Sequence, residues 1–185
     1  MGSIGKKKSL GYNKIPSEPF MLNDPRAITS RAKAESLLDH NGKLDIKEFI
    51  IKNYPEIDLI LEPLDSNVSG ELICKDGKWT MKINTKHPLT RQRFTMSHEL
   101  GHYVSHRQKS TMFTDSLFYR KNEKKDPIEY QADKFAAEIL MPEEYVKNAI
   151  INKGVLNVDE LAALFGVSGQ AMLFRLKDLN YTVNE

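Results

Sequence analysis

The chain has 185 residues, 40% of them apolar, and its 27 Lys and Arg side chains nearly balance its 25 Asp and Glu side chains. This length predicts one domain, or one domain with a small appendage, with enough apolar residues to bury a core. A net charge of +2 does not favour a nucleic-acid or membrane-surface binder. The single Cys74 excludes an internal disulfide framework and a Cys-rich zinc site. With no membrane-length apolar run and no signal peptide, we expect a soluble cytoplasmic protein.

Residues 1–23 predict a flexible basic tail, because they contain several Gly and Pro residues, four lysines and no apolar period. The lysines (Lys6, Lys7, Lys8, Lys14) are interpreted as a solvated segment, with weak polyanion contact as the alternative. Asp24 followed by Pro25 predicts the start of a helix that runs through Leu38 and stops at Asn41–Gly42. Asp45 and Glu48 have capping-box spacing and predict a second, short helix.

The pattern then changes to that of strands, which we expect over residues 57–61, 70–75 and 79–84. Asp76–Gly77 between the last two is a strong hairpin signal. Helices follow, over residues 91–106, 127–141, 142–151, 158–165 and 168–179, and the polar segment 107–126 is expected to be a long loop. Helices, a small sheet and further helices indicate an α+β fold. The expected organisation is a tail (1–23), a main domain (24–151) and a C-terminal helical extension (152–185).

The strongest motif is His98-Glu99-Leu100-Gly101-His102. Two His four residues apart lie about 6 Å apart along one helical face, so both rings can reach one Zn²⁺ ion. Glu99 projects about 100° around the helix from His98, which suits a general base that is not itself a ligand. This is the arrangement of zinc peptidases.

A catalytic zinc site needs a third protein ligand. His106 would lie about 12 Å along a straight helix from His98, too far to share the ion. Glu129 and Asp133, four residues apart downstream, are better candidates: Glu129 as ligand, and Asp133 as acceptor of the outer N–H of a ligand His. The alternative is that the segment starting at Asp126 is simply a capping box, with its acidic residues suited to a helix N-terminus.

At these residues the sequence resembles the ImmA/IrrE metallopeptidases. The resemblance rests on residues 91–102 (RQRFTMSHELGH) and 129–142 (EYQADKFAAEILMP) and extends over roughly residues 27–180. It implies a zincin-like fold with a small mixed or antiparallel sheet, with His98, His102 and Glu129 as zinc ligands and Glu99 as base. The family often has Asn where this chain has Asp133, and either side chain can accept an imidazole N–H. Family members cleave repressors or related DNA-binding partners of mobile elements, phage switches, stress responses and toxin–antitoxin systems.

The implied activity is zinc-dependent hydrolysis of a peptide bond in a repressor or antitoxin-like partner. Glu99 would take a proton from the zinc-activated water and pass it to the departing amine. The oxyanion needs a further donor, for which Tyr103, Tyr119 and Tyr130 are candidates. A sheet edge could hold an extended substrate by strand addition.

Two rival functions remain. Residues 161–172 have a helix-turn-helix pattern, which would send the helix over 168–179 into a DNA groove. Residues 157–181, however, carry two basic and three acidic side chains, which argues against phosphate contacts and favours packing on the core or on a partner. The other rival is a partner-binding or DNA-binding module that keeps the zinc fold without turnover.

Overall fold

The computed structural model describes residues 23–116 and 126–182. Along the chain the elements are α1 (Pro25–Ala34), α2 (Ile46–Asn53), β1 (Ile57–Glu62), β2 (Val68–Lys75), β3 (Lys78–Asn84), α3 (Leu89–His106), β4 (Met112–Ser116), α4 (Pro127–Leu140), α5 (Glu143–Lys147), a π-helical turn (Asn148–Asn152), α6 (Val158–Phe165) and α7 (Gly169–Asp178). The predicted α+β class is confirmed. The predicted tail over residues 1–23 lies, apart from Asn23, outside the described residues.

The sheet has the order β1-β3-β2-β4 and is mixed, since β1 runs parallel to β3 and the other pairs are antiparallel. The predicted hairpin joins β2 to β3, and both residues of its turn have positive φ, 51° at Asp76 and 78° at Gly77. Side chains from the middle strands alternate toward the core, with Leu72, Met81 and Ile83 fully buried. Within the described residues, β1 and β4 are the two edges.

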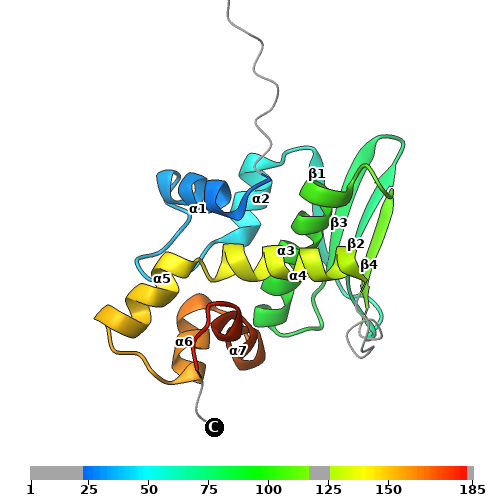
Figure 1. Cartoon of the computed structure of the whole chain (residues 1–185). Coiled ribbons are helices and arrows are strands. Elements are labelled where there is room, and N and C mark those ends of the chain that lie inside the picture. Colours follow the sequence, from blue (N-terminus) through cyan, green and yellow to red (C-terminus); the bar gives the residue numbers. More distant parts are fainter. Residues whose placement is uncertain (1–22, 117–125, 183–185) are drawn as a thin grey trace, which may run out of the picture.

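Helix α3 lies between the sheet and α4, and α1 and α2 lie at one end of this arrangement (Figure 1). A helix packed on two sides must be buried around much of its circumference, which explains its weak amphipathic pattern. Its residues 95–104 are all buried. The polar motif of α3 is thus held between two layers of packed structure.

One feature of the first half differs from the sequence prediction. Helix α1 ends at Ala34 instead of continuing through Leu38, because Ser36 takes a positive φ of 59°. The backbone N–H groups of Ser36 and Leu37 then bond back to the carbonyls of Lys33 and Ala32, which closes the helix in a Schellman motif without glycine. Helix α2 forms as expected, with Asp45 accepting from the Glu48 backbone N–H at 3.1 Å.

The expected long loop over residues 107–126 was wrong in part, because residues 112–116 form the edge strand β4. This strand pairs with β2, from Val68↔Ser116 to Ile73↔Met112. Phe113 is its one deeply buried apolar side chain, and the next inward position is occupied by buried Asp115. The apolar alternation that marks a strand is therefore missing.

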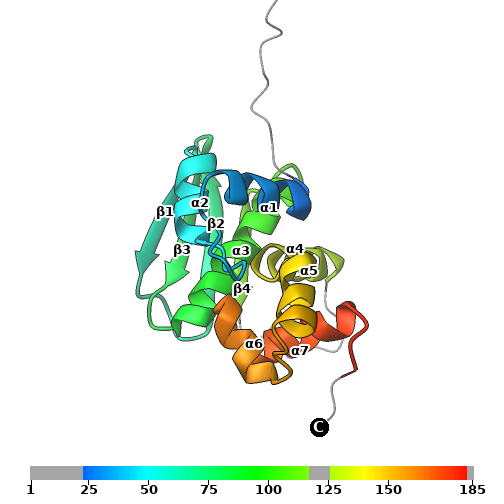
Figure 2. The ribbon, with the colours of Figure 1, turned by 90° about the vertical axis from the view of Figure 1, so that its left-hand side faces the viewer.

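The two C-terminal helices pack together below α4 and α5 (Figure 2). Leu161, Phe165, Met172 and Leu176 belong to the same hydrophobic cluster as the buried residues of the sheet and of α1 to α4. Arg93 of α3 donates to the carbonyl oxygens of Gly166 and Phe165 at 3.0 and 3.2 Å, at the end of α6. These contacts attach the helical pair to the helix that carries the His motif. In the described part of the chain, no helix combines the length and apolar character needed to cross a membrane.

Candidate metal centre

Helix α3 places His98 and His102 on one buried face, one turn apart. Their side chains are only 2% and 1% exposed. The two Nε2 atoms point at each other and are 3.0 Å apart. The predicted convergence of the two rings is therefore present in the fold.

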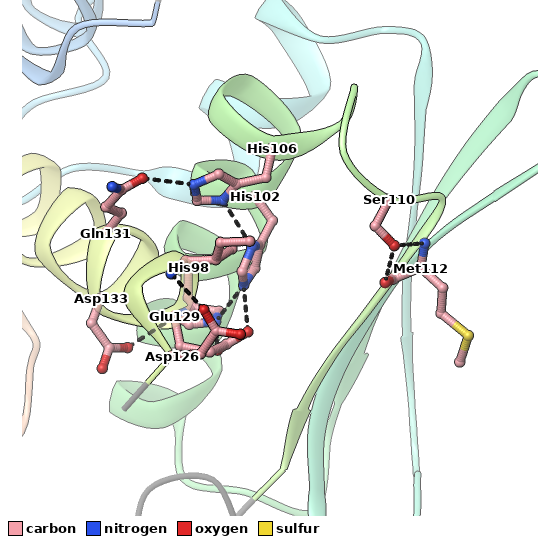
Figure 3. A network of polar contacts seen from close by, with 10 residues as sticks. His98, His102, His106, Ser110, Met112, Asp126, Glu129, Gln131 and Asp133 are labelled. Atoms are coloured by element: carbon pink, nitrogen blue, oxygen red, sulfur yellow. Dashed lines mark hydrogen bonds and ion pairs between the residues drawn. The ribbon is translucent and has the colours of Figure 1, made fainter. Parts of the chain in front are cut away.

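Helix α4 brings Glu129 to the same point (Figure 3). Its Oε2 is 3.2 Å from His98 Nε2, and its Oε1 is 3.3 Å from His102 Nε2. Donor atoms that share a tetrahedral zinc ion at bond lengths of ~2.0–2.1 Å lie about 3.3 Å from one another. Two imidazole nitrogens, each facing one oxygen of the same carboxylate group at such a separation, fit a zinc ion with a position left for water or substrate.

The alternative interpretation, that the segment starting at Asp126 is simply a capping box, holds for Asp126 but not for Glu129. Asp126 caps α4, its Oδ1 accepting from the Ile128 backbone N–H at 2.9 Å. Pro127 occupies the first helical position, where its missing N–H costs nothing. The Glu129 carboxylate turns instead toward the His pair. The cap therefore fixes the start of the helix that delivers Glu129.

Asp133 lies one turn after Glu129 and is 2.9 Å from His98 through Oδ1 and Nδ1. Neutral His98 then donates from Nδ1 and keeps the lone pair of Nε2 available for a cation. The sequence prediction paired Asp133 with a ligand His without saying which one, and the fold selects His98.

A second contact fixes the other ring of the pair. Phe113 of β4 stacks on the His102 ring with a centroid separation of 4.5 Å and an interplanar angle of 16°. Nothing in the sequence pattern indicated this contact, because β4 itself was not expected. The plane of the His102 ring is thus set by the edge of the sheet.

The electrostatics of the site suit a bound cation. Burial opposes a charge on His98, but hydrogen bonds with Asp133 and Glu129 outweigh it and raise the pKa of His98 to about 10. Burial lowers the pKa of His102. Burial also opposes ionisation of Glu129, yet its hydrogen bonds with His102 and His98 hold the pKa of Glu129 well below the usual range. The carboxylates therefore favour a positive charge at the point where the three donors meet.

Glu99 is the buried acid beside this centre. It is 0% exposed, and neither carboxylate oxygen has a hydrogen-bond partner among the described residues. Burial, reinforced by the nearby Asp115 and Glu129 and opposed by His98, raises the pKa of Glu99 to about 8. An unpaired buried carboxyl group costs free energy, so its presence here points to a chemical task for Glu99.

The tyrosine candidates for an oxyanion donor are placed as follows. Tyr103 is buried and donates its hydroxyl to Glu56 Oε1 at 2.7 Å, with Tyr54 and Trp79 packed edge-on against its ring. Tyr130 is 55% exposed and lines a groove together with residues of α1 and α7. Tyr119 lies outside the described residues. The role of Tyr119 or Tyr130 as donor stays a prediction.

One protein family and two known proteins match this chain. The profile of a peptidase family, the IrrE N-terminal-like domain, matches residues 53–177. Metallopeptidase ImmA of Bacillus subtilis (strain 168) is 27% identical over 97 residues, which cover 52% of this chain and 56% of that protein. A solved structure, a Mycobacterium tuberculosis transcriptional regulator, superposes with a TM-score of 0.57 at 14% identity, covering 83% of this chain and 46% of the other. The chain thus spans about half of each relative, and the structural match shows a shared fold.

Proposed function

Because this chain belongs to the peptidase family of the IrrE N-terminal-like domain, we propose that it is a zinc-dependent endopeptidase. Its substrate would be one specific regulatory protein, a repressor or antitoxin-like partner, in the cytoplasm. The observation that carries the proposal is the donor set of His98, His102 and Glu129 beside the unpaired carboxyl group of Glu99.

His98, His102 and Glu129 would hold the ion. A zinc ion held there supplies Lewis acidity, which activates water and polarises a carbonyl group. Asp133 keeps His98 in the tautomer that leaves Nε2 free to bind. Two imidazoles and one carboxylate form the ligand set of known zinc peptidases.

Glu99 would act as the general base and then as the general acid. A base works best when its pKa lies near the working pH, and the pKa of about 8 for Glu99 lies much nearer neutrality than that of an ordinary carboxyl group. Its unpaired oxygens can take the proton of a water molecule and later give it to the amine that leaves.

The edge strand β4 offers a way to hold the substrate. Its Phe113 contacts the ring of His102, so β4 borders the candidate centre directly. An extended peptide that adds to a sheet edge forms main-chain hydrogen bonds and gains specificity from alternate side-chain pockets. A peptide paired with β4 would have its backbone beside the His pair.

The decisive test is Glu99→Gln, expressed together with the proteins encoded by the genes on either side of this one. The variant keeps the size of the side chain but removes the base, so cleavage should fall by at least about 10²–10⁴-fold. Zinc content should not change, because Glu99 is not among the three donors, and the variant should be at least as thermally stable as the wild type, because it no longer buries an unpaired ionisable carboxyl group. Cut fragments with the wild type and intact partner with Glu99→Gln would support the proposal. Equal effects of both proteins on the partner would instead support a binding module without turnover.

A further inference from the structure

His106 is a third buried histidine on α3, one turn beyond His102. It is 1% exposed and was predicted to lie too far from His98 to share its ion. The Nδ1 atoms of His102 and His106 are 3.1 Å apart, and His106 Nε2 is 3.0 Å from Gln131 Oε1 (Figure 3). Both ring nitrogens of His106 are therefore occupied by protein partners, and neither joins the donor set.

The proton positions along this chain of contacts are fixed by the role of His102. Its Nε2 faces His98 and Glu129 and must be without a proton to bind a cation. The proton of neutral His102 then lies on Nδ1 and is donated to His106 Nδ1. His106 in turn carries its proton on Nε2 and donates it to the carbonyl oxygen of Gln131.

The opposite direction is chemically possible but incompatible with metal binding. If the Gln131 amide donated to His106, His106 would donate from Nδ1 to His102. The proton of His102 would then lie on Nε2, where it would block the cation. Only an acceptor at position 131 stabilises the metal-binding tautomer.

We propose that His106 and Gln131 are positioning residues that hold His102 in its metal-binding tautomer and orientation, an inference that rests on the proposed zinc site. His106 accepts the Nδ1 proton of His102 and orients its ring, as Asp133 does for His98. Phe113 fixes the plane of the His102 ring from one side, and His106 fixes the direction in which its Nδ1 atom points. Gln131 lies on α4 between Glu129 and Asp133, so one helix supports both His ligands.

We call the chain of hydrogen bonds from His102 through His106 to Gln131 the relay. Zinc affinity, measured by competition with a chromogenic chelator, tests it. Removal of an outer-shell partner typically weakens metal binding about 10–100-fold, and this loss is expected for both Gln131→Ala and His106→Ala. Gln131 is exposed, so its substitution leaves the core intact. The matched control is Gln170→Ala, another exposed glutamine on a helix, which should bind zinc like the wild type. Metal-free Gln131→Ala and Gln170→Ala should unfold at similar temperatures.

Two further variants separate the relay from general packing. Gln131→Glu keeps an acceptor and should bind zinc at least as tightly as the wild type. Gln131→Lys offers only donors and should bind at least as weakly as Gln131→Ala. In ¹⁵N NMR spectra of the zinc-loaded protein, His106 should show the Nε2–H tautomer.

The outcomes distinguish the relay from the site itself. Wild-type zinc affinity in both Gln131→Ala and His106→Ala, or an Nδ1–H tautomer of His106, would overturn the relay while leaving the zinc site standing. A wild type that bound no zinc would overturn the proposed site and the relay with it.

Discussion

Gly101 of α3 packs directly against Ala132 of α4 where the two helices are in contact. A Cβ atom on Gly101 would stand 3.3 Å from the Cα of Ala132 and 3.1 Å from a ring carbon of Phe135. These distances are tighter than ordinary side-chain contacts. The glycine inside the His motif therefore lets α4 come near enough to bring Glu129 to the His pair.

Gly101→Ala should consequently destabilise the protein, against the usual trend. In an exposed helix interior this substitution stabilises by up to about 1 kcal/mol. Here the extra methyl group would press against α4, and such overpacking typically costs about 1–3 kcal/mol. Urea unfolding of the metal-free protein would measure this, and zinc affinity should fall as Glu129 moves away. Ser105→Ala, an exposed change on the same helix, is the control, and a Gly101→Ala protein as stable as this control would contradict the packing argument.

The metal assignment predicts one zinc ion per chain and its loss in Glu129→Ala. Glu129 supplies the only oxygen donor of the three-residue cluster found among the described residues. Asp126→Ala is the matched control, because it removes an acidic side chain from the same helix turn and costs only a cap, typically ~1 kcal/mol. Elemental analysis after gel filtration should find zinc in Asp126→Ala and not in Glu129→Ala. Full zinc in Glu129→Ala would mean that another residue is the third ligand.

The sequence predicted the parts of this site that depend on local spacing. The His pair and the pair of Glu129 and Asp133 each lie four residues apart on one helix, so their shared faces follow from helical geometry. The cap at Asp45 and the hairpin at Asp76–Gly77 were equally local and formed as expected. Each of these features depends on residues within one turn of one another.

The remainder depends on contacts between distant segments. Strand β4 exists because residues 112–116 pair with β2, and its inward Asp115 hides the usual apolar alternation. The contacts of His102 with Phe113, and of His106 with Gln131, join residues on different elements. No periodicity encodes such contacts, because they appear only once α3, α4 and the sheet are packed together.

The raised pKa values predict that the metal-free protein loses stability as pH rises above neutrality. The pKa of His98 is about 10 in the folded protein and 6.5 ordinarily. His98 therefore contributes stability that is present below pH 6.5 and lost as pH rises through 10. The pKa of Glu99 is about 8 in the folded protein and 4.5 ordinarily. Glu99 therefore contributes stability that is present below pH 4.5 and lost as pH rises through 8. The lowered pKa of His102 removes stability only on the acid side, below about 6.5.

Thermal unfolding with a chelator should therefore show a Tm that falls between pH 7 and pH 9.5. Glu99→Gln removes one of the two titrating groups, so its Tm should fall less steeply over the same range. Zinc binding must displace the His98 proton, so calorimetry at pH 7 in buffers of different ionisation enthalpy should detect proton release. A constant or rising Tm in the metal-free wild type would contradict the assigned charge on His98.

The C-terminal helices should not give this protein measurable affinity for DNA in the absence of a partner. Of the two basic residues in 157–181, Arg175 is only 6% exposed and donates from Nε to the Met141 carbonyl oxygen at 3.0 Å. This leaves Lys177 on the surface of a segment that also carries Asp159, Glu160 and Asp178. Phosphate contacts supply essentially all of non-specific DNA affinity, and one exposed cation among three acids provides almost none.

A mobility-shift titration of the purified protein against duplex DNA at low salt should accordingly show no complex up to about 10 µM. Low salt favours binding, because fewer counterions compete for the phosphates, so a negative result there is informative. Lys177→Glu serves as the paired variant and should behave as the wild type does. A wild-type complex that formed below this concentration and weakened in Lys177→Glu would identify α7 as a DNA-reading helix. In that case regulation would act through DNA contact by this protein in addition to the proposed cleavage of a partner.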